Sequence, residues 1–250
     1  MRKIYKIITL CAVVLQLVAC GSAPLLTDNR AIQNPWALAS IASANVQIWT
    51  HYKLPGKTPS QFEYEFKDGR DAIAAKAQSS ASMLRQVMRV EPEALRRIKF
   101  SWKLPDLIQH ADMSLREFDD SPVRVVLAFE GDRSKFSGKN AMLSELAHAL
   151  TGEPMPYATL MYVWCNNCEP EMVIFNPHTD RIRKLPLESG SSKLNRWMDY
   201  ERAVRDDFFK AFGEEPGMLT SISIMTDTDN TKSFAQAWYG TVSLTPAIGK

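Results

Sequence analysis

The sequence has little excess charge of either sign, few cysteines and no long apolar run after its first 20 residues. It contains 30 Lys and Arg residues and 28 Asp and Glu residues, for a formal net charge of +2. Three of the basic residues lie in the first six positions, and residues 1–19 contain no acidic residue. The rest of the chain is therefore nearly neutral, which argues against a basic surface for nucleic acid.

Signature motifs of several enzyme classes are also absent. The chain has no G-x-S-x-G, no H-E-x-x-H, no P-loop and no G-x-G-x-x-G. These absences remove most of the support for a serine hydrolase, a zincin or a nucleotide-dependent enzyme. The four histidines show no spacing typical of zinc ligands.

The first 20 residues have the pattern of a bacterial signal peptide. Arg2, Lys3 and Lys6 precede an apolar run over 7–19, which is too short for an ordinary membrane-spanning helix. The run ends in the sequence LVAC, whose last residue is Cys20. This ending resembles the lipobox of bacterial lipoproteins, in which the cysteine is lipidated and becomes the new amino-terminus. A plain cleaved secretory signal is the alternative.

The resemblance to lipoproteins implies a location. Residues 1–19 would be removed as the signal peptide, and residues 20–35 would form the lipidated Cys20 and its tether. No Asp follows Cys20, so the usual inner-membrane retention signal is missing. We therefore expect the protein to lie in the cell envelope. In an organism with two membranes, it would be anchored at the periplasmic face of the outer membrane. The membrane is then a partner through the lipid anchor, and the folded part need not touch lipid.

The remaining chain is rich in alternating apolar and polar residues, the pattern of half-buried strands. Asp68-Gly69 supplies a hairpin turn. Helical spacing predicts two short helices, one with Leu143, Leu146, Ala147 and Leu150 on its apolar face and one over 204–212. We predict one mainly β domain over 36–250, a sandwich or jelly-roll with these two helices. The strand-like runs are 61–67, 98–104, 123–129, 159–164 and 234–244.

Several segments resemble the uncharacterised bacterial family known as domain of unknown function 3047. The most specific are MTDTDNT at 225–231 and RDDFFKAFGEEP at 205–216. Others are SSASML at 79–84, DDSPVRVVLAFEGD at 119–132 and PYATLMYVW at 156–164. The resemblance implies an exported protein with a jelly-roll or galactose-binding-like sandwich, and it brings no activity. The Asp- and Asn-rich turn before a last strand also looks like that of carbohydrate-binding sandwiches.

That acidic turn is the strongest candidate site. Asp227, Asp229 and Asn230 follow an apolar strand and offer the hard oxygen ligands that suit Ca²⁺. The same groups can accept hydrogen bonds from sugar hydroxyls. It is not an EF-hand, because Lys232 stands where that loop requires glycine. An Asx-rich turn without a ligand is the alternative.

Two further groups of charges are candidates for ligand binding. Asp119 and Asp120 precede Arg124 at the start of a strand, and carboxylates near an arginine have shifted pKa values. Solvated loop charges are the alternative. Arg202, Asp206 and Asp207 form the other group. Arg202 and Asp206 are four residues apart and share one helix face, where a surface salt bridge is the alternative.

Aromatic side chains could supply platforms for sugar rings. Tyr162 and Trp164 share one face of the strand over 159–164. Tyr239 lies on the opposite face of its strand from Trp238. Core packing is the alternative for all of them.

Cys165 and Cys168 form an even pair in an exported chain, which predicts a disulfide across a turn. A redox-active cysteine normally opens a helix, whereas Glu169 and Pro170 follow here. Redox exchange is the alternative.

These observations favour a non-catalytic envelope lipoprotein that binds a saccharide or another small polar ligand. The alternatives are a protein-binding scaffold for envelope assembly and a carboxylate-dependent glycan hydrolase. A hydrolase would need two carboxyl groups about 5–9 Å apart. No catalytic residue is assigned, and calcium is the one cofactor considered.

Overall fold

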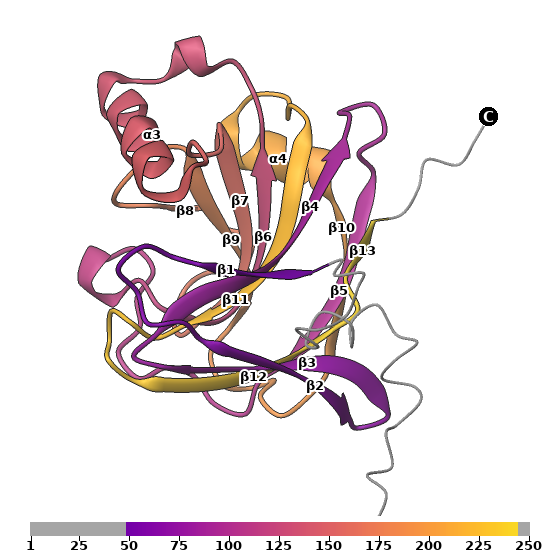
Figure 1. The fold of residues 1–250 in the computed structure, drawn as a ribbon. Coiled ribbons are helices and arrows are strands. Elements are labelled where there is room, and N and C mark those ends of the chain that lie inside the picture. The colour runs from indigo at the N-terminus through magenta and orange to yellow at the C-terminus, as the bar shows by residue number, and fades with distance from the viewer. Residues whose placement is uncertain (1–48, 245–250) are drawn as a thin grey trace, which may run out of the picture.

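The structure is a computed structural model that describes residues 49–244. The signal peptide, Cys20 and the tether lie outside the described residues. Within 49–244 the chain forms two β-sheets and two α-helices (Figure 1), so the prediction of a mainly β sandwich with two helices is confirmed. No helix in this range is long and apolar enough to cross a bilayer.

The larger sheet has seven strands in the order β1-β4-β11-β6-β7-β9-β8. Its neighbouring strands are antiparallel except β7 and β9, which run parallel. The strands are β1 (Thr50–Lys53), β4 (Ala81–Val90), β6 (Ser121–Phe129), β7 (Ala158–Cys165), β8 (Ile174–Phe175), β9 (Ile182–Ser189) and β11 (Leu219–Asp227).

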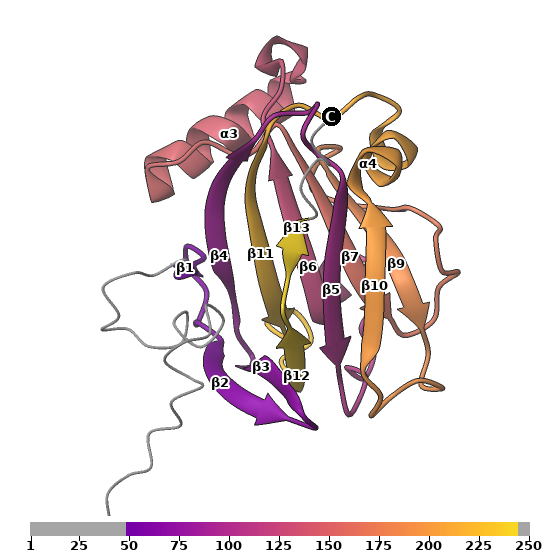
Figure 2. The same cartoon turned by 90° about the vertical axis from the view of Figure 1, so that its right-hand side faces the viewer.

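The smaller sheet has six strands in the order β10-β5-β12-β3-β2, with β13 also paired to β5. In Figure 2 its strands β10, β5 and β13 lie toward the viewer. Asp68 and Gly69 join β2 to β3, and both have the positive φ that a tight hairpin turn requires. The strands are β2 (Gln61–Lys67), β3 (Arg70–Gln78), β5 (Arg97–Lys103), β10 (Met198–Ala203), β12 (Phe234–Gly240) and β13 (Ser243–Leu244).

Alternation along the strands directs one set of side chains from each sheet into a shared core. Phe100 and Trp102 of β5 and Tyr162 of β7 belong to the same buried cluster. The rings of Phe100 and Tyr162 stack with centroids 5.4 Å apart and so join the two sheets. In β12 the inward residues are Ala237 and Tyr239, whereas Trp238 packs on the other face with Ala72 and Ala74.

Helix α4 (Val204–Phe212) contributes Val204 and Phe208 to the core. The Phe208 ring lies 4.7 Å from that of Phe129 on β6. The helix ends at Gly213, whose φ of 71° suits a residue without a side chain.

Helix α3 (Gly138–Thr151) lies near the larger sheet, away from β5 and β10 (Figures 1 and 2). It ends at Gly152, but it does not pack through the predicted face. Asn140 and Ser144 are buried, whereas Leu146 and Leu150 are 54% and 61% exposed. The buried side chains are polar because loop residues pair with them; Asn140, for example, accepts a 2.7 Å hydrogen bond from Thr179.

Candidate functional site

The outer face of the larger sheet carries a buried network of charges. Arg124 of β6 donates from Nε to Asp227 Oδ1 at 2.8 Å and from Nη2 to Asp227 Oδ2 at 3.0 Å. Asp119 accepts from Arg124 at 3.1 Å and from Lys184 of β9 at 2.6 Å. Lys184 Nζ also donates to the carbonyl of Met113 at 2.7 Å. The network therefore fastens the segment between β5 and β6 over the sheet.

Burial and ion pairing oppose each other in this network. Burial raises the pKa of Asp227 to about 6, although the Arg124 guanidinium lowers it. Burial, followed by the charge of Arg124, lowers the pKa of Lys184 to about 8, and Asp119 acts against that shift. Burial also lowers the pKa of Arg124, but Asp227 and Asp119 outweigh it and raise that pKa. Burial disfavours the charged form of each of these four side chains, and the oppositely charged neighbours stabilise that form.

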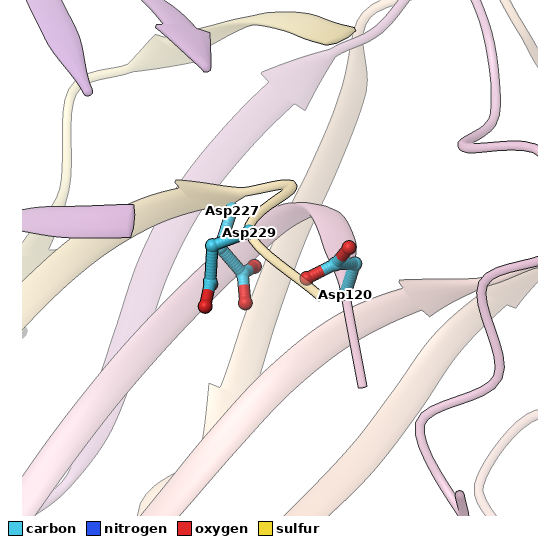
Figure 3. A group of neighbouring side chains, drawn as sticks. All are labelled: Asp120, Asp227 and Asp229. Carbon is cyan, nitrogen blue, oxygen red and sulfur yellow. The ribbon is translucent and has the colours of Figure 1, made fainter. Parts of the chain in front are cut away.

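The acidic turn after β11 adjoins this network. Carboxylate oxygens of Asp120, Asp227 and Asp229 lie within 4.8 Å of one another, and Figure 3 shows the three side chains together. Each carboxylate has a protein partner. Asp120 Oδ2 accepts from the backbone N–H and the hydroxyl of Thr231, both at 2.6 Å, and Asp229 pairs with Lys57. These contacts are those of an Asx-rich turn, and Ca²⁺ binding stays a prediction.

The side chains of the other predicted polar residues do not join this cluster, although the backbone N–H of Asn230 donates to Asp120 Oδ1 at 3.2 Å. Asn230 donates its carboxamide to the carbonyl of Arg116 at 2.6 Å. Arg202 pairs with Asp207 at 2.7 Å rather than with Asp206, which is exposed. The sequence pattern favoured Asp206 over Asp207 as the partner of Arg202, whereas Asp207 is the buried one and also accepts a 2.8 Å hydrogen bond from Tyr162. Its buried neighbours Val204 and Phe208 were the available signal, since they place Asp207 on the inner face of α4.

The three predicted aromatic residues lie in the core between the sheets. Tyr162, Trp164 and Tyr239 are each at most 1% exposed. The Tyr239 hydroxyl lies 3.0 Å from that of Thr226, and Trp164 donates to the carbonyl of Gly190 at 3.0 Å. None of the three rings presents a face to solvent.

The predicted disulfide between Cys165 and Cys168 is present. It closes the turn that follows β7. Cys165 packs with Met113 and Val163 in a small apolar cluster on the outer face of the larger sheet. The bond therefore braces the same covering segment that Lys184 holds.

An open cavity on the outer face of the smaller sheet was not singled out from the sequence. It encloses about 490 Å³ and is referred to here as the trough. Its lining comes from β3, β5, β10 and the end of β12, and its outward-facing side chains carry charged and hydroxyl groups. These residues are Arg70, Asp71, Lys99, Phe100, Ser101, Asp199, Tyr200, Glu201, Gly240 and Thr241.

The floor of the trough lies close to the backbone because Gly240, which lines it, has no side chain. A Cβ atom on Gly240 would collide with the Ser101 hydroxyl of the neighbouring strand. Outward residues next to Gly240 are also small: Ala72 is its partner on β3, and Ala74 follows on the same face. Small residues on one face of neighbouring strands leave room for a molecule to approach the backbone.

Paired charges form the walls of the trough. Arg70 makes a bidentate pair with Asp199, with Nη2 donating to Oδ2 at 3.1 Å. Lys99 Nζ lies 3.4 Å from a carboxylate oxygen of Glu201. These pairs are exposed to solvent, so their partners can exchange.

Two indole rings flank the trough beneath cationic side chains. Lys67 Nζ lies 4.3 Å from the centre of the Trp238 ring, and the Arg70 guanidinium lies 5.2 Å from that of Trp197. Outward alternation along β5, β10 and β12 was the available signal for this face. That alternation does not reveal the trough by itself, because no local pattern shows that these strands are neighbours.

Sequence comparison assigns the family. The chain belongs to the family described as "Protein of unknown function (DUF3047)", whose profile matches residues 47–243. The resemblance seen in the sequence is therefore confirmed. No curated protein matches the chain.

Solved structures with a similar arrangement of strands include three glycan-related proteins. The family 11 carbohydrate-binding module of a Clostridium thermocellum cellulase is 10% identical, covers 83% of this chain and 93% of its own, and has a TM-score of 0.39. The xyloglucanase domain of NopAA from Sinorhizobium fredii is 7% identical, with coverages of 80% and 93% and a TM-score of 0.42. Endoglucanase 3 from Trichoderma harzianum is 8% identical, with coverages of 79% and 95% and a TM-score of 0.40. At these scores the likenesses carry no argument about this chain's function.

Proposed function

We propose that the trough binds a saccharide and that the protein is a non-catalytic saccharide-binding sandwich. The observation that carries this proposal is the open 490 Å³ cavity, in which exchangeable ion pairs stand over a floor of small residues. Ligand sites are concave and place a few polar groups beside apolar surface. The trough has both, since the Trp197 ring lies beside Gly240 at its floor, next to the charged groups.

The chemistry of the trough suits a neutral sugar. Adjacent sugar hydroxyls donate and accept hydrogen bonds, and Asp199 accepts while Arg70 donates. The lining has two cationic and three acidic side chains, so no strong excess of charge selects a charged ligand. The charges of the other sheet are less available, because Arg124 and Asp227 are buried and already bonded to each other.

The lipobox-like sequence that ends at Cys20 suggests where in the cell this binding would occur. A lipid on Cys20 would hold the sandwich at the periplasmic face of the outer membrane, where envelope glycans are within reach. The test is fractionation of cells that express the Cys20→Ser variant. Release from the membrane fraction supports the anchor, whereas persistent membrane association contradicts it.

Calorimetric titration of the Cys20→Ser chain with a panel of neutral envelope oligosaccharides tests the trough. The double variant Asp199→Asn, Glu201→Gln should bind the best oligosaccharide at least tenfold more weakly, because it removes two charged acceptors. Glu63→Gln is the matched control, since Glu63 is an exposed residue of the same sheet that does not line the trough. Equal affinity in the double variant and the control would contradict the proposal.

One observation favours the alternative of a protein-binding scaffold. Met142, Leu146 and Leu150 recur at helical spacing on α3 and are 64%, 54% and 61% exposed. A photocrosslinker at Leu146 in living cells should then capture one defined partner, while a crosslinker at Glu63 should not. Equal labelling from both positions would contradict a docking role for α3.

A further inference from the structure

A second cavity, of about 260 Å³, lies between the first turn of α3 and the loop that joins β8 to β9. It is referred to here as the α3 pocket. It shares no residue with the trough. Its lining includes Ser137, Lys139, Phe175, Asp180 and Arg183.

Arg183 is the unusual member of this pocket. The residue is 8% exposed, and its Nε is buried without a hydrogen-bond partner. Its Nη1 donates to the carbonyl of the preceding Ile182 at 3.2 Å. No carboxylate among residues 49–244 forms a salt bridge with it, whereas Arg181, two positions earlier, pairs with Glu214 at 3.0 Å. A buried guanidinium without a counter-ion is costly.

The surroundings of Arg183 hold the guanidinium in place but do not neutralise it. Its centre lies 4.2 Å from the Phe175 ring and 5.5 Å from the Phe212 ring. Burial lowers the pKa of Arg183, and nearby Asp180 opposes this shift. The Asp180 carboxylate is held elsewhere, since it accepts a 2.5 Å hydrogen bond from Asn140 and lies 3.8 Å from Arg181 Nε.

Two other features add positive potential to the same pocket. The 14-residue helix α3 begins at Gly138, directly after its N-cap Ser137, which lines the cavity, so the positive end of its dipole faces the cavity. Lys139 lies in the first turn, lines the cavity and is exposed. Phe175, which is 64% exposed, gives an apolar wall beside these cationic groups.

We propose that the α3 pocket binds the oxyanion group, phosphate or carboxylate, of a small organic ligand. Arg183 pairs with the oxyanion, Lys139 screens it from the solvent side, and Phe175 contacts the carbon skeleton. Both kinds of oxyanion match the planar donors of a guanidinium. The inference is independent of saccharide binding in the trough, because the two cavities have separate linings.

The test is a calorimetric titration of the full chain at low salt with glycerol 3-phosphate and, separately, with glucuronate. At least one of the two should bind the wild type. Arg183→Met should weaken that binding at least tenfold, and Lys139→Gln should weaken it severalfold. Lys135→Gln is the matched control, because Lys135 is an exposed lysine just before α3 that does not line the pocket.

The outcomes separate the sources of the anion. Binding of glycerol 3-phosphate alone assigns a phosphate ligand, and binding of glucuronate alone assigns a carboxylate ligand. If Arg183→Met does not fold, the affinity of Lys139→Gln tests the proposal, because substitution of that exposed side chain should leave the fold intact. Absence of binding by both anions, or binding that neither variant changes, would overturn the proposal.

Discussion

The outer faces of the two sheets use charged side chains in opposite ways. On the larger sheet, Arg124 and Lys184 are buried, and each is bonded to fixed partners that hold a covering segment in place. On the smaller sheet, Arg70 and Lys99 line an open trough and pair at the surface. Buried ion pairs specify one arrangement, whereas exposed pairs can give up a partner to a ligand. The same residue types therefore serve structure on one face and, under the proposed function, binding on the other.

The largest expected effect comes from breaking the buried network. Arg124→Met leaves Asp227 and Asp119 without their shared cation, and it should lower the free energy of unfolding by about 3–5 kcal/mol. Arg70→Met on the other face should cost less than about 1 kcal/mol. Urea denaturation of both variants measures the difference. A cost for Arg124→Met as small as that for Arg70→Met would show that the two faces do not differ.

Reduction of the disulfide should have the next largest effect. The two cysteines are three positions apart, so the closed loop is short and its loss should cost about 2 kcal/mol. Thermal unfolding with and without a phosphine reductant measures this cost. Sugar binding in the trough should persist under reduction, because Cys165 lies on the other sheet. Loss of binding at temperatures where the reduced chain is folded would argue against separate faces.

The pH dependence of stability should carry the signature of Lys184. Its pKa is about 8 in the folded chain, below its ordinary value of 10.5. Between these values the unfolded chain holds more protons, so the stability contributed by this group rises with pH, by up to about 1.4 kcal/mol per pH unit. Urea denaturation of wild type and Lys184→Met at pH 7.5, 8.5 and 9.5 measures the slope. The wild type should show the more positive slope, and parallel curves would contradict a pKa of Lys184 that burial has lowered.

The smallest expected effect on stability belongs to the trough. Asp199→Asn combined with Glu201→Gln removes only solvent-exposed pairs and should change the free energy of unfolding by less than about 1 kcal/mol. The same double variant should lose sugar affinity. A large loss of stability would instead indicate that these carboxylates hold the sheet together.

Local patterns in the sequence were sufficient for the elements of the fold. Alternation predicted the strands that became β2, β5, β6 and β7, and Asp68-Gly69 predicted the first hairpin. Helical spacing predicted both helices, although not the packing face of α3. These signals work because they depend on neighbours a few residues away.

The candidate sites depend on contacts that no local pattern contains. Arg124 and Asp227 are 103 positions apart, and the register between β6 and β11 decides that they meet. The trough needs β10 beside β5 and β12 beside β3. The packing face of α3 was mispredicted for a related reason, since polar loop residues rather than an apolar surface lie against it.

The most direct test is an NMR titration of the isotope-labelled Cys20→Ser chain with the oligosaccharide that binds best. The largest shifts of backbone amide signals should come from residues that line the trough, among them Lys99, Ser101 and Thr241. The turn over 227–231 should change little, because its carboxylates already have protein partners. Shifts confined to 227–231, with an unchanged trough, would contradict the assignment of binding to the smaller sheet.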